Sequence, residues 1–155
     1  MATENKARIR RLVQAWNDRD LVSARELFDV DRFVWHGPND ESSDPGFSDQ
    51  GLRNEFAAFP DIRYEIADVI AEGDKVVVRL VEPATFTGEW LGIPPTGNRV
   101  TLRGTSIFRF ERGKIVEEWD RWDTVGLLLE LGVGSEGLAP IIREWQAFGL
   151  YPAAG

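Results

Sequence analysis

The hydrophobic period changes near residue 60, and this change constrains the fold more than any other feature of the sequence. Before it, apolar side chains recur at helical spacing, and the stripe Ile9, Leu12, Val13 and Trp16 predicts a helix over residues 4–19. After it, alternation with period two predicts strands at residues 62–71, 75–83, 85–90, 99–110 and 115–122. Helices followed by a long antiparallel meander indicate an α+β fold in which the sheet wraps the helices.

Shorter elements fill the space before the meander. Asp20 is a candidate cap for a short second helix, and residues 33–36 are typical of a strand. Residues 39–46 are rich in turn formers and predict a polar loop. Ser48 is expected to cap a third helix, which Pro60 would end.

Two more helices are expected after the meander. Asp123 is a candidate cap for a helix over residues 124–131. A last helix should cover residues 139–148, with Pro140 in its first turn. We therefore expect one domain over residues 1–155, with a helical extension that begins near residue 124.

Acids and tryptophans are crowded into the last predicted strand, at residues 117–123 (EEWDRWD). Because side chains alternate between the two faces of a strand, Val116, Glu118, Asp120 and Trp122 share one side. Carboxylates beside a large indole lose hydration, which is unfavourable unless the site is partly polar or transfers protons. The strand therefore predicts an acid-base pocket.

Composition excludes several kinds of site and partner. The sequence has no cysteine, so it offers neither a disulfide nor a thiolate nucleophile. Its formal charge of -8, without a basic stripe, opposes nucleic-acid binding. No segment approaches the ~20 apolar residues of a membrane span, and none resembles a signal peptide, so we expect a cytoplasmic protein without a membrane partner.

No cofactor or metal is expected from the motifs. The glycines at 88, 92 and 97 lack the strand–turn–helix context of a phosphate-binding loop. One histidine with scattered acids does not make a transition-metal site. A nucleophile elbow for a Ser-His-Asp triad is also missing.

Several short strings, in order, make the sequence similar to the SnoaL-like polyketide cyclases of the NTF2-like superfamily. The matching strings are residues 15–21 (AWNDRDL), 34–38 (VWHGP), 58–62 (AFPDI), 70–76 (IAEGDKV), 92–97 (GIPPTG), 107–110 (IFRF) and 113–120 (GKIVEEWD). The resemblance implies a cone-shaped roll, in which a curved antiparallel sheet packs on N-terminal helices around a deep, mostly apolar pocket. It also implies catalysis by an aspartate on the last strand, which corresponds to Asp120, in an intramolecular aldol ring closure. Family cyclases usually add a histidine on the preceding strand, but here that position is Ser106.

Alternation on the penultimate strand supports an inward position for Ser106, because it shares a face with Leu102 and Phe108. If Asp120 lies opposite, the two side chains can form a hydrogen bond, and an apolar cavity would raise the pKa of the carboxyl. Such a group could remove a proton from carbon next to a carbonyl. The structural alternative is a salt bridge from Asp120 to Arg103 or Arg121.

His36 and Glu118 are further candidates. His36 is the only histidine, and it could donate a proton to a developing oxyanion or serve as a structural hydrogen-bond donor. Glu118 shares the face of Asp120, and two close carboxyls can separate their pKa values so that one stays protonated. We expect Glu118 nearer the open rim, in water.

The chain is rich in aromatic residues for its size, and most of them must be core. Some should line the pocket, because flat aromatic walls suit flat polycyclic ligands. The substrate-binding candidates are Trp16, Phe33, Phe56, Phe59, Trp90, Phe108, Glu118 and Trp122. Residues 90–94 form a loop that could cover the pocket mouth or a neighbouring subunit.

Together with these observations, the resemblance implies a cofactor-independent enzyme of the polyketide or ester cyclase type that acts on an apolar carbonyl compound, for which polycyclic molecules are candidates. Asp120 would be the base, His36 the oxyanion donor, and Ser106 the group that orients the acid. The alternatives are another NTF2-like acid-base enzyme, such as an isomerase or epoxide hydrolase, and a non-catalytic domain that binds an apolar ligand. The resemblance also implies a homodimer or larger homo-oligomer, formed through outer strand positions such as Val77, Ile107 and Trp119.

Overall fold

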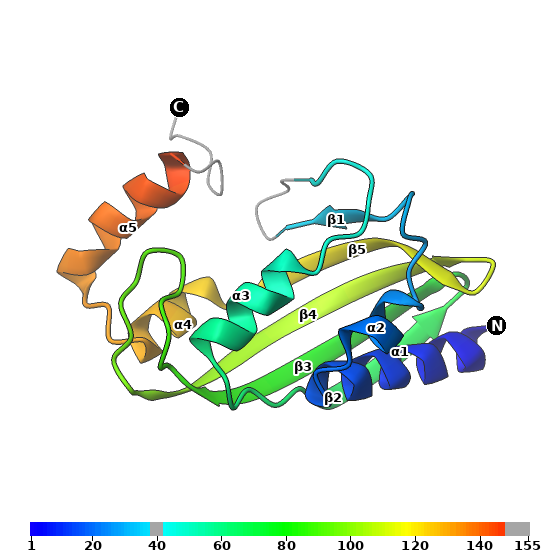
Figure 1. The fold of residues 1–155 in the computed structure, drawn as a ribbon, viewed down its shortest axis with the longest axis horizontal. Helices are drawn as coiled ribbons and strands as arrows, with labels where there is room; N and C mark the ends of the chain where they lie inside the picture. Colours follow the sequence, from blue (N-terminus) through cyan, green and yellow to red (C-terminus); the bar gives the residue numbers. More distant parts are fainter. Residues whose placement is uncertain (38–41, 148–155) are drawn as a thin grey trace.

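The computed structural model describes residues 1–37 and 42–147 and contains a mixed α+β fold (Figure 1). The chain begins with two helices and a short strand, continues with a third helix and four long strands, and ends with two helices. The elements in order are α1 (Ala2–Asn17), α2 (Leu21–Arg25), β1 (Val34–His36), α3 (Gln50–Ala58), β2 (Glu65–Glu72), β3 (Lys75–Thr85), β4 (Arg99–Glu111), β5 (Lys114–Trp122), α4 (Thr124–Glu130) and α5 (Ser135–Ala147). The predicted fold class is confirmed.

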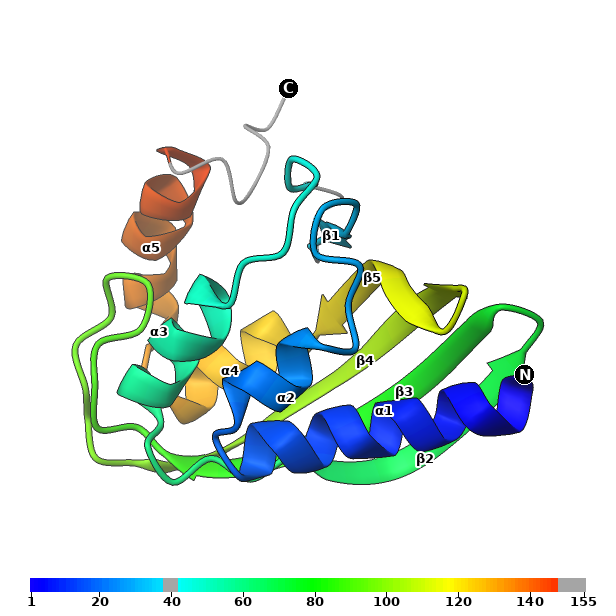
Figure 2. The ribbon, with the colours of Figure 1, turned by 45° about the vertical axis from the view of Figure 1, so that its right-hand side comes forward.

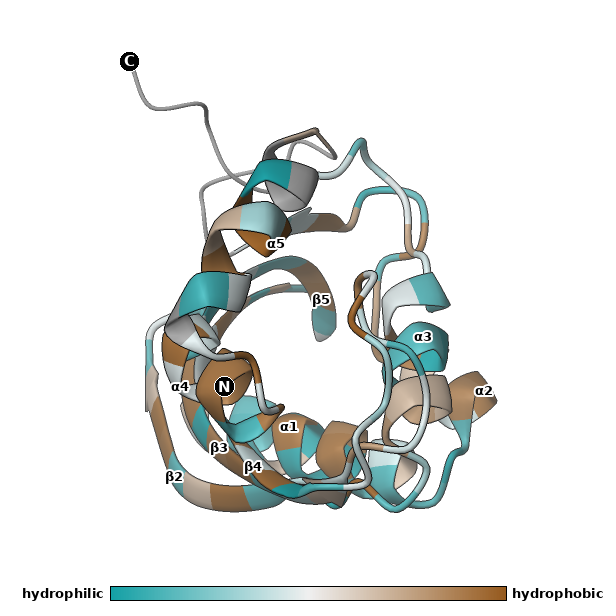
Figure 3. Cartoon of the chain, turned by 90° about the vertical axis from the view of Figure 1, so that its left-hand side faces the viewer, coloured by the Kyte–Doolittle hydropathy of each residue, from teal (hydrophilic) through white to brown (hydrophobic). Residues whose placement is uncertain are grey.

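The five strands form one sheet in the order β1-β5-β4-β3-β2. The strands from β2 to β5 are an antiparallel meander, whereas β1 joins the edge of β5 in parallel. The sheet is curved, and α1 lies along its concave side (Figure 2). In the end-on view, β2, β3 and β4 form one wall and α3 the opposite wall (Figure 3).

Helix α1 forms because its apolar stripe can be buried against β2 and β3. Ile9 and Leu12 are fully buried, and Val13 and Trp16 nearly so. The end of the helix is fixed by Asn17, whose side-chain amide donates to the main-chain oxygen of Tyr64 and accepts from its N–H. This pair of bonds holds α1 against the start of β2.

Helix caps follow the sequence expectations at two of three places. Asp20 accepts from the N–H of Ser23, and Asp123 accepts from the N–H of Gly126. At α3 the N-cap residue is Asp49 rather than Ser48, although the Ser48 hydroxyl accepts from Gln50 N–H. The expected cap was therefore wrong by one residue.

The predicted strand over residues 85–90 is wrong beyond Thr85, which ends β3. The N–H groups of Thr87 and Gly88 both donate to the carbonyl of Ala58, at 3.0 and 2.9 Å. A Cβ at Gly88 would lie 2.1 Å from the Ala57 oxygen, so only glycine fits this contact. The segment is held by the end of α3 instead of by a neighbouring strand.

The other boundary corrections are smaller. β2 begins at Glu65, three residues later than expected, and α5 begins at Ser135, four residues earlier. Pro140 therefore lies inside α5 rather than in its first turn. Residues 39–41 of the expected loop and residue 148 of the expected last helix lie outside the described residues.

Within residues 1–37 and 42–147, no helix has both the length and the apolar character needed to cross a membrane.

Candidate active site

A cavity of about 530 Å³ lies on the concave side of the sheet. Its walls come from α1, α3, α4 and four of the five strands, and they are mostly apolar. The aromatic and aliphatic lining includes Trp16, Phe28, Phe33, Trp35, Phe47, Leu52, Tyr64, Leu80, Trp90, Leu91, Leu102, Trp122, Leu127 and Leu128. A cavity of this size and character suits an apolar small molecule.

Asp120 lies in this wall and is 8% exposed. Its position on β5 is opposite Ser106 on β4, and the Ser106 hydroxyl donates to Asp120 Oδ1 at 2.5 Å. The indole N–H of Trp35 donates to Oδ2 at 2.7 Å. Each carboxylate oxygen of Asp120 therefore has its own neutral donor, which fixes the plane of the carboxyl group.

Burial raises the pKa of Asp120 above its ordinary value, and the hydrogen bonds from Ser106, Trp35, Glu118 and Trp122 only partly offset this effect. A raised pKa brings the carboxyl closer to the range in which it can both accept and return a proton at neutral pH. The geometry that the alternation of β4 and β5 predicts for Ser106 and Asp120 is therefore present.

Glu118 is buried beside Asp120, so the expectation that it lies at a watery rim was wrong. It is 9% exposed, and its pKa is well above the ordinary value because of burial and then the charge of Asp120. A hydrogen bond joins the two carboxyls. Glu118 therefore resists ionisation beside Asp120, and the two groups form an acid pair.

Two further carboxyls line the same cavity, and the sequence analysis named neither of them as a candidate. Glu55 on α3 accepts from the hydroxyl of Tyr64, and burial raises the pKa of Glu55 to about 7. Glu82 on β3 is fully buried, and burial, followed by the charges of Glu55 and Asp120, raises its pKa well above the ordinary value. The cavity is thus apolar in area but contains four acids whose pKa values are raised.

Gly104 allows Trp122 to form part of the wall. The two residues are paired across β4 and β5, and the Trp122 ring lies over the glycine. A Cβ at position 104 would lie 2.4 Å from the ring, well inside van der Waals contact. The glycine is therefore a packing requirement of the site.

His36 does not face the cavity, and its expected position as an oxyanion donor was wrong. Its ring stacks on Trp119 at 4.9 Å, and its nitrogens bond the Ser42 hydroxyl at 2.8 Å and Glu117 at 3.3 Å. In β1, the position that faces inward is Trp35, which pairs with Glu118, whereas His36 pairs with Trp119. Neighbours in a strand point to opposite faces, so Trp35 and His36 cannot both line the cavity.

The substrate-binding candidates divide into two groups. Trp16, Phe33, Trp90, Glu118 and Trp122 line the cavity. The other three candidates, Phe56, Phe59 and Phe108, do not belong to its lining, and this part of the prediction was wrong.

Those three phenylalanines serve the core instead. Phe59 and Phe108 are fully buried, and Phe59 packs against Phe86 and Trp90 at 5.4 Å. Phe56 is covered by the guanidinium of Arg19, 4.1 Å from its ring centre. Phe59 thus supports the cavity wall from behind, through Trp90.

The loop after β3 reaches the cavity, as expected for residues 90–94. Trp90 and Leu91 line the cavity, and Trp90 is fixed by main-chain bonds to Ile93, at 3.0 and 2.8 Å. Arg103, the expected salt-bridge alternative for Asp120, instead pairs with Glu130 at 3.0 Å. Arg121 donates to the main-chain oxygens of Gly37 and Asp120.

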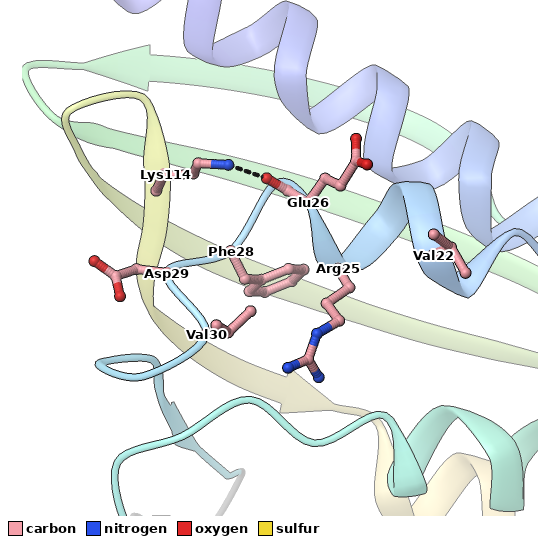
Figure 4. Close-up of a pocket in the computed structure, with 7 residues that line it drawn as sticks. All are labelled: Val22, Arg25, Glu26, Phe28, Asp29, Val30 and Lys114. Carbon is pink, nitrogen blue, oxygen red and sulfur yellow. Dashed lines mark hydrogen bonds between the residues drawn. The ribbon is translucent and has the colours of Figure 1, made fainter.

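A second hollow, between α2 and the start of β5, is shallow and of mixed charge (Figure 4). Arg25 and Lys114 line it together with Glu26 and Asp29, and Lys114 donates to the main-chain oxygen of Glu26. Such mixed charges favour no single kind of ligand. Among the described residues, no group of three or more acids and histidines is arranged to hold a metal ion.

Some of the site residues that were not predicted do have a signal in the sequence. Glu82 falls on the same face of β3 as Val76, Val78 and Leu80, so period two already predicts that it points toward the interior. The alternation of Trp35 and His36 likewise favours one of the two, not both. No sequence signal connects Glu55 and Tyr64, because they meet only when α3 packs over the start of β2.

Comparisons with known proteins found a matching family model and similar solved structures. Residues 6–131 match the family model described as SnoaL-like polyketide cyclase. Among solved structures, AclR from Streptomyces galilaeus, described as a candidate hydroxylase, is 33% identical, with a TM-score of 0.77 over 85% of this chain and 98% of that one. No curated protein matches the sequence.

Two candidate polyketide cyclases are also similar. IdmH from Streptomyces antibioticus is 32% identical, with a TM-score of 0.69 over 83% of this chain and 99% of that one. A SnoaL-like protein from Jannaschia is 22% identical, with a TM-score of 0.76 over 86% and 95% of the two chains, a likeness that shows the fold alone.

Proposed function

Because this chain belongs to the SnoaL-like polyketide cyclase family and has its NTF2-like fold, we propose that it is a cofactor-independent acid-base enzyme that closes a ring in an apolar carbonyl compound. The observation that carries the proposal is Asp120, a buried carboxyl held by Ser106 and Trp35 in an apolar cavity. The aromatic walls of the cavity support the ligand class, because they suit a polyketide-type molecule with flat rings.

In the proposed reaction, ionised Asp120 removes a proton from carbon next to a carbonyl, and the electrons of that C–H bond form an enolate. The enolate carbon then bonds to a second carbonyl carbon of the same molecule, whose C=O π electrons move to its oxygen. This alkoxide takes the proton back from Asp120, so atoms and charge balance without another reactant. A positioned acid-base group contributes about 10²- to 10⁴-fold in rate, and holding both carbons together adds further acceleration.

The neighbours of Asp120 have supporting roles in this scheme. Ser106 and Trp35 orient the carboxylate from two sides and hold it in the cavity wall. Protonated Glu118 stabilises the ionised form of Asp120, since it donates to it. His36 has no role in the reaction, because it lies on the other face of the sheet.

A second candidate function is hydroxylation, because AclR, at 33% identity, is described as a candidate hydroxylase. Product masses distinguish the possibilities. An aldol ring closure or an isomerisation leaves the mass unchanged, a hydroxylation adds one oxygen atom, and an epoxide hydrolysis adds one water. A ligand-binding domain gives no product.

Proton removal from carbon can be tested without the natural substrate. The probe is 2-tetralone, a bicyclic ketone, whose exchange of α-hydrogens for deuterium is followed by NMR after binding is verified by tryptophan fluorescence. Asp120→Asn should reduce enzyme-dependent exchange by about 10²-fold or more while circular dichroism remains that of the native fold. His36→Ala is the matched control and should retain exchange. Full exchange by the Asp120→Asn protein would contradict the proposal.

A further inference from the structure

Glu82 is a buried acid for which the proposed reaction has no use. It follows Val76, Val78 and Leu80 on the inner face of β3, and it lines the cavity although its exposed fraction is zero. Among the described residues, neither of its carboxyl oxygens has a hydrogen-bond partner. Buried polar groups in folded proteins are nearly always paired, so an unpaired carboxyl in a cavity wall indicates that something else completes it.

A second unpaired group lies in the same cavity. The indole N–H of Trp16, on α1, is buried and has no acceptor within the described part of the chain. Trp16 packs against the ring of Tyr64 at 5.3 Å, and the Tyr64 hydroxyl is held by Glu55. The charges of Glu55 and Glu82 both raise the pKa of Tyr64, after the larger effect of burial, so Glu82 faces the same region.

The unpaired groups lie away from Asp120. Val78 is opposite Ser106, which is opposite Asp120, and Glu82 is four residues further along β3. On a flat sheet this separates Glu82 and Asp120 by about 16 Å, from ~4.8 Å between strands and ~3.3 Å per residue. Curvature shortens this distance, since the charge of Asp120 still acts on Glu82, and a ligand that contacts both carboxyls must span the cavity between β3 and β5.

The two unpaired groups together define the ligand chemistry. A carbonyl oxygen would accept from Trp16, and from Glu82 where that carboxyl is protonated, but it would offer the accepting oxygen of Glu82 no donor. An ammonium group would donate to Glu82 but leave the Trp16 N–H without an acceptor. A hydroxyl group does both, since its oxygen accepts and its hydrogen is donated.

We propose that Glu82 and the Trp16 N–H form a second binding point, which recognises a hydroxyl group of the ligand remote from the carbon that reacts at Asp120. The inference rests on the proposed function in one respect, that the cavity takes an elongated apolar molecule. It adds that this molecule carries a hydroxyl at its far end. Glu82 is then a specificity residue. Its unpaired carboxyl destabilises the ligand-free protein, and ligand binding removes this destabilisation.

The test compares two probes of equal shape, 2-naphthol and 2-methylnaphthalene, by calorimetry. The native protein should bind 2-naphthol about tenfold more tightly, because the hydroxyl pairs both groups. Glu82→Met should abolish this preference, and Glu82→Gln, which keeps the shape, should reduce it. Glu82→Met should also raise the melting temperature, since it removes an unpaired buried acid.

Asp120→Asn is the matched control. It should stop proton exchange but keep the preference for 2-naphthol, so failure of the catalytic proposal and failure of this one are separable. If the preference follows Asp120 instead of Glu82, or if Glu82→Met leaves it intact, the second binding point does not exist. Tighter binding of 2-naphthylmethylammonium than of 2-naphthol, abolished in Glu82→Met, would replace the hydroxyl with a cation and overturn the proposal.

Discussion

Raising the pH from 5 to 8 should destabilise this protein, because its cavity holds carboxyls that resist ionisation. Glu55 gives the clearest measure, since burial raises its pKa from 4.5 to about 7. The nearby charge of Asp120 acts in the same direction, whereas the hydrogen bond from Tyr64 and the charge of Arg19 oppose it. The pKa values of Glu82, Glu118 and Asp120 are raised too, so every acid of the cluster contributes with the same sign.

The magnitude follows from linkage between protonation and folding. Below pH 4.5 Glu55 is protonated in both the folded and the unfolded chain, and it costs nothing. Between pH 4.5 and about 7 the unfolded chain releases this proton while the folded chain keeps it, so the free energy of unfolding falls as the pH rises. Each pKa unit between the folded and the unfolded chain corresponds to about 1.36 kcal/mol. Glu55 therefore lowers the free energy of unfolding by about 2 to 3 kcal/mol over this pH range, if some water enters the cavity.

Surface carboxyls do not obscure this window. Glu111 is an example, because hydrogen bonds from Arg109 and Arg32 lower its pKa to about 2. A lowered pKa gives stability that is complete above pH 4.5 and is lost only as the pH falls through the folded value. These groups therefore act in acid and leave the slope between pH 5 and 8 to the cavity.

Urea unfolding at constant ionic strength, followed by tryptophan fluorescence at each pH unit from 5 to 8, measures the slope directly. Glu55→Gln keeps a partner for Tyr64 but cannot ionise, so it should flatten the slope by the Glu55 contribution. Glu65→Gln, at an exposed position on β2, is the matched control and should leave the slope unchanged. A stability that stays constant or rises between pH 5 and 8 would refute the reasoning, because the four acids could then not be buried together.

Two further predictions concern packing at the two faces of the sheet. Gly104→Ala should lower the free energy of unfolding, measured in urea, by about 1 to 3 kcal/mol, because the new methyl group displaces the Trp122 ring. Ligand affinity should fall as well. Unchanged stability would mean that the ring does not lie over Gly104. On the outer face, Val77, Ile107 and Trp119 lie side by side in register. We therefore expect sedimentation at micromolar concentration to reveal a homo-oligomer, which Ile107→Glu should dissociate. A monomeric native protein would contradict this prediction.

Much of the fold was predictable, because the hydrophobic period is a local property. The stripe on α1 and the alternation on β3, β4 and β5 predicted those elements to within a few residues. The strand over residues 85–90 failed for a nonlocal reason, since the N–H groups of Thr87 and Gly88 are taken by the carbonyl of Ala58. Which partner a backbone N–H finds is decided by tertiary packing and is not written in the pattern of the segment itself.

The candidate site was predictable to the same extent. Alternation placed Asp120 and Ser106 on the inner faces of neighbouring strands, but their pairing also needs the register shift between Arg109 and Phe110, which the alternation does not predict. The same alternation, applied to β1, would have chosen Trp35 over His36. The prediction followed the chemistry of histidine instead, and strand geometry prevailed.

By itself, the sequence determined that Glu118 and Asp120 share one face of the last strand and that Ser106 lies on the apolar face of its neighbour, because period two depends only on the backbone. The tertiary structure alone decided that Glu55 and Glu82 join Asp120 and Glu118 around one hollow, and that Glu82 finds no partner there. These residues lie far apart along the chain and meet only through the curvature of the sheet and the packing of α3. The energy of a buried carboxyl depends on these neighbours and on the loss of water, which is why the four-acid cluster appeared only in the folded protein.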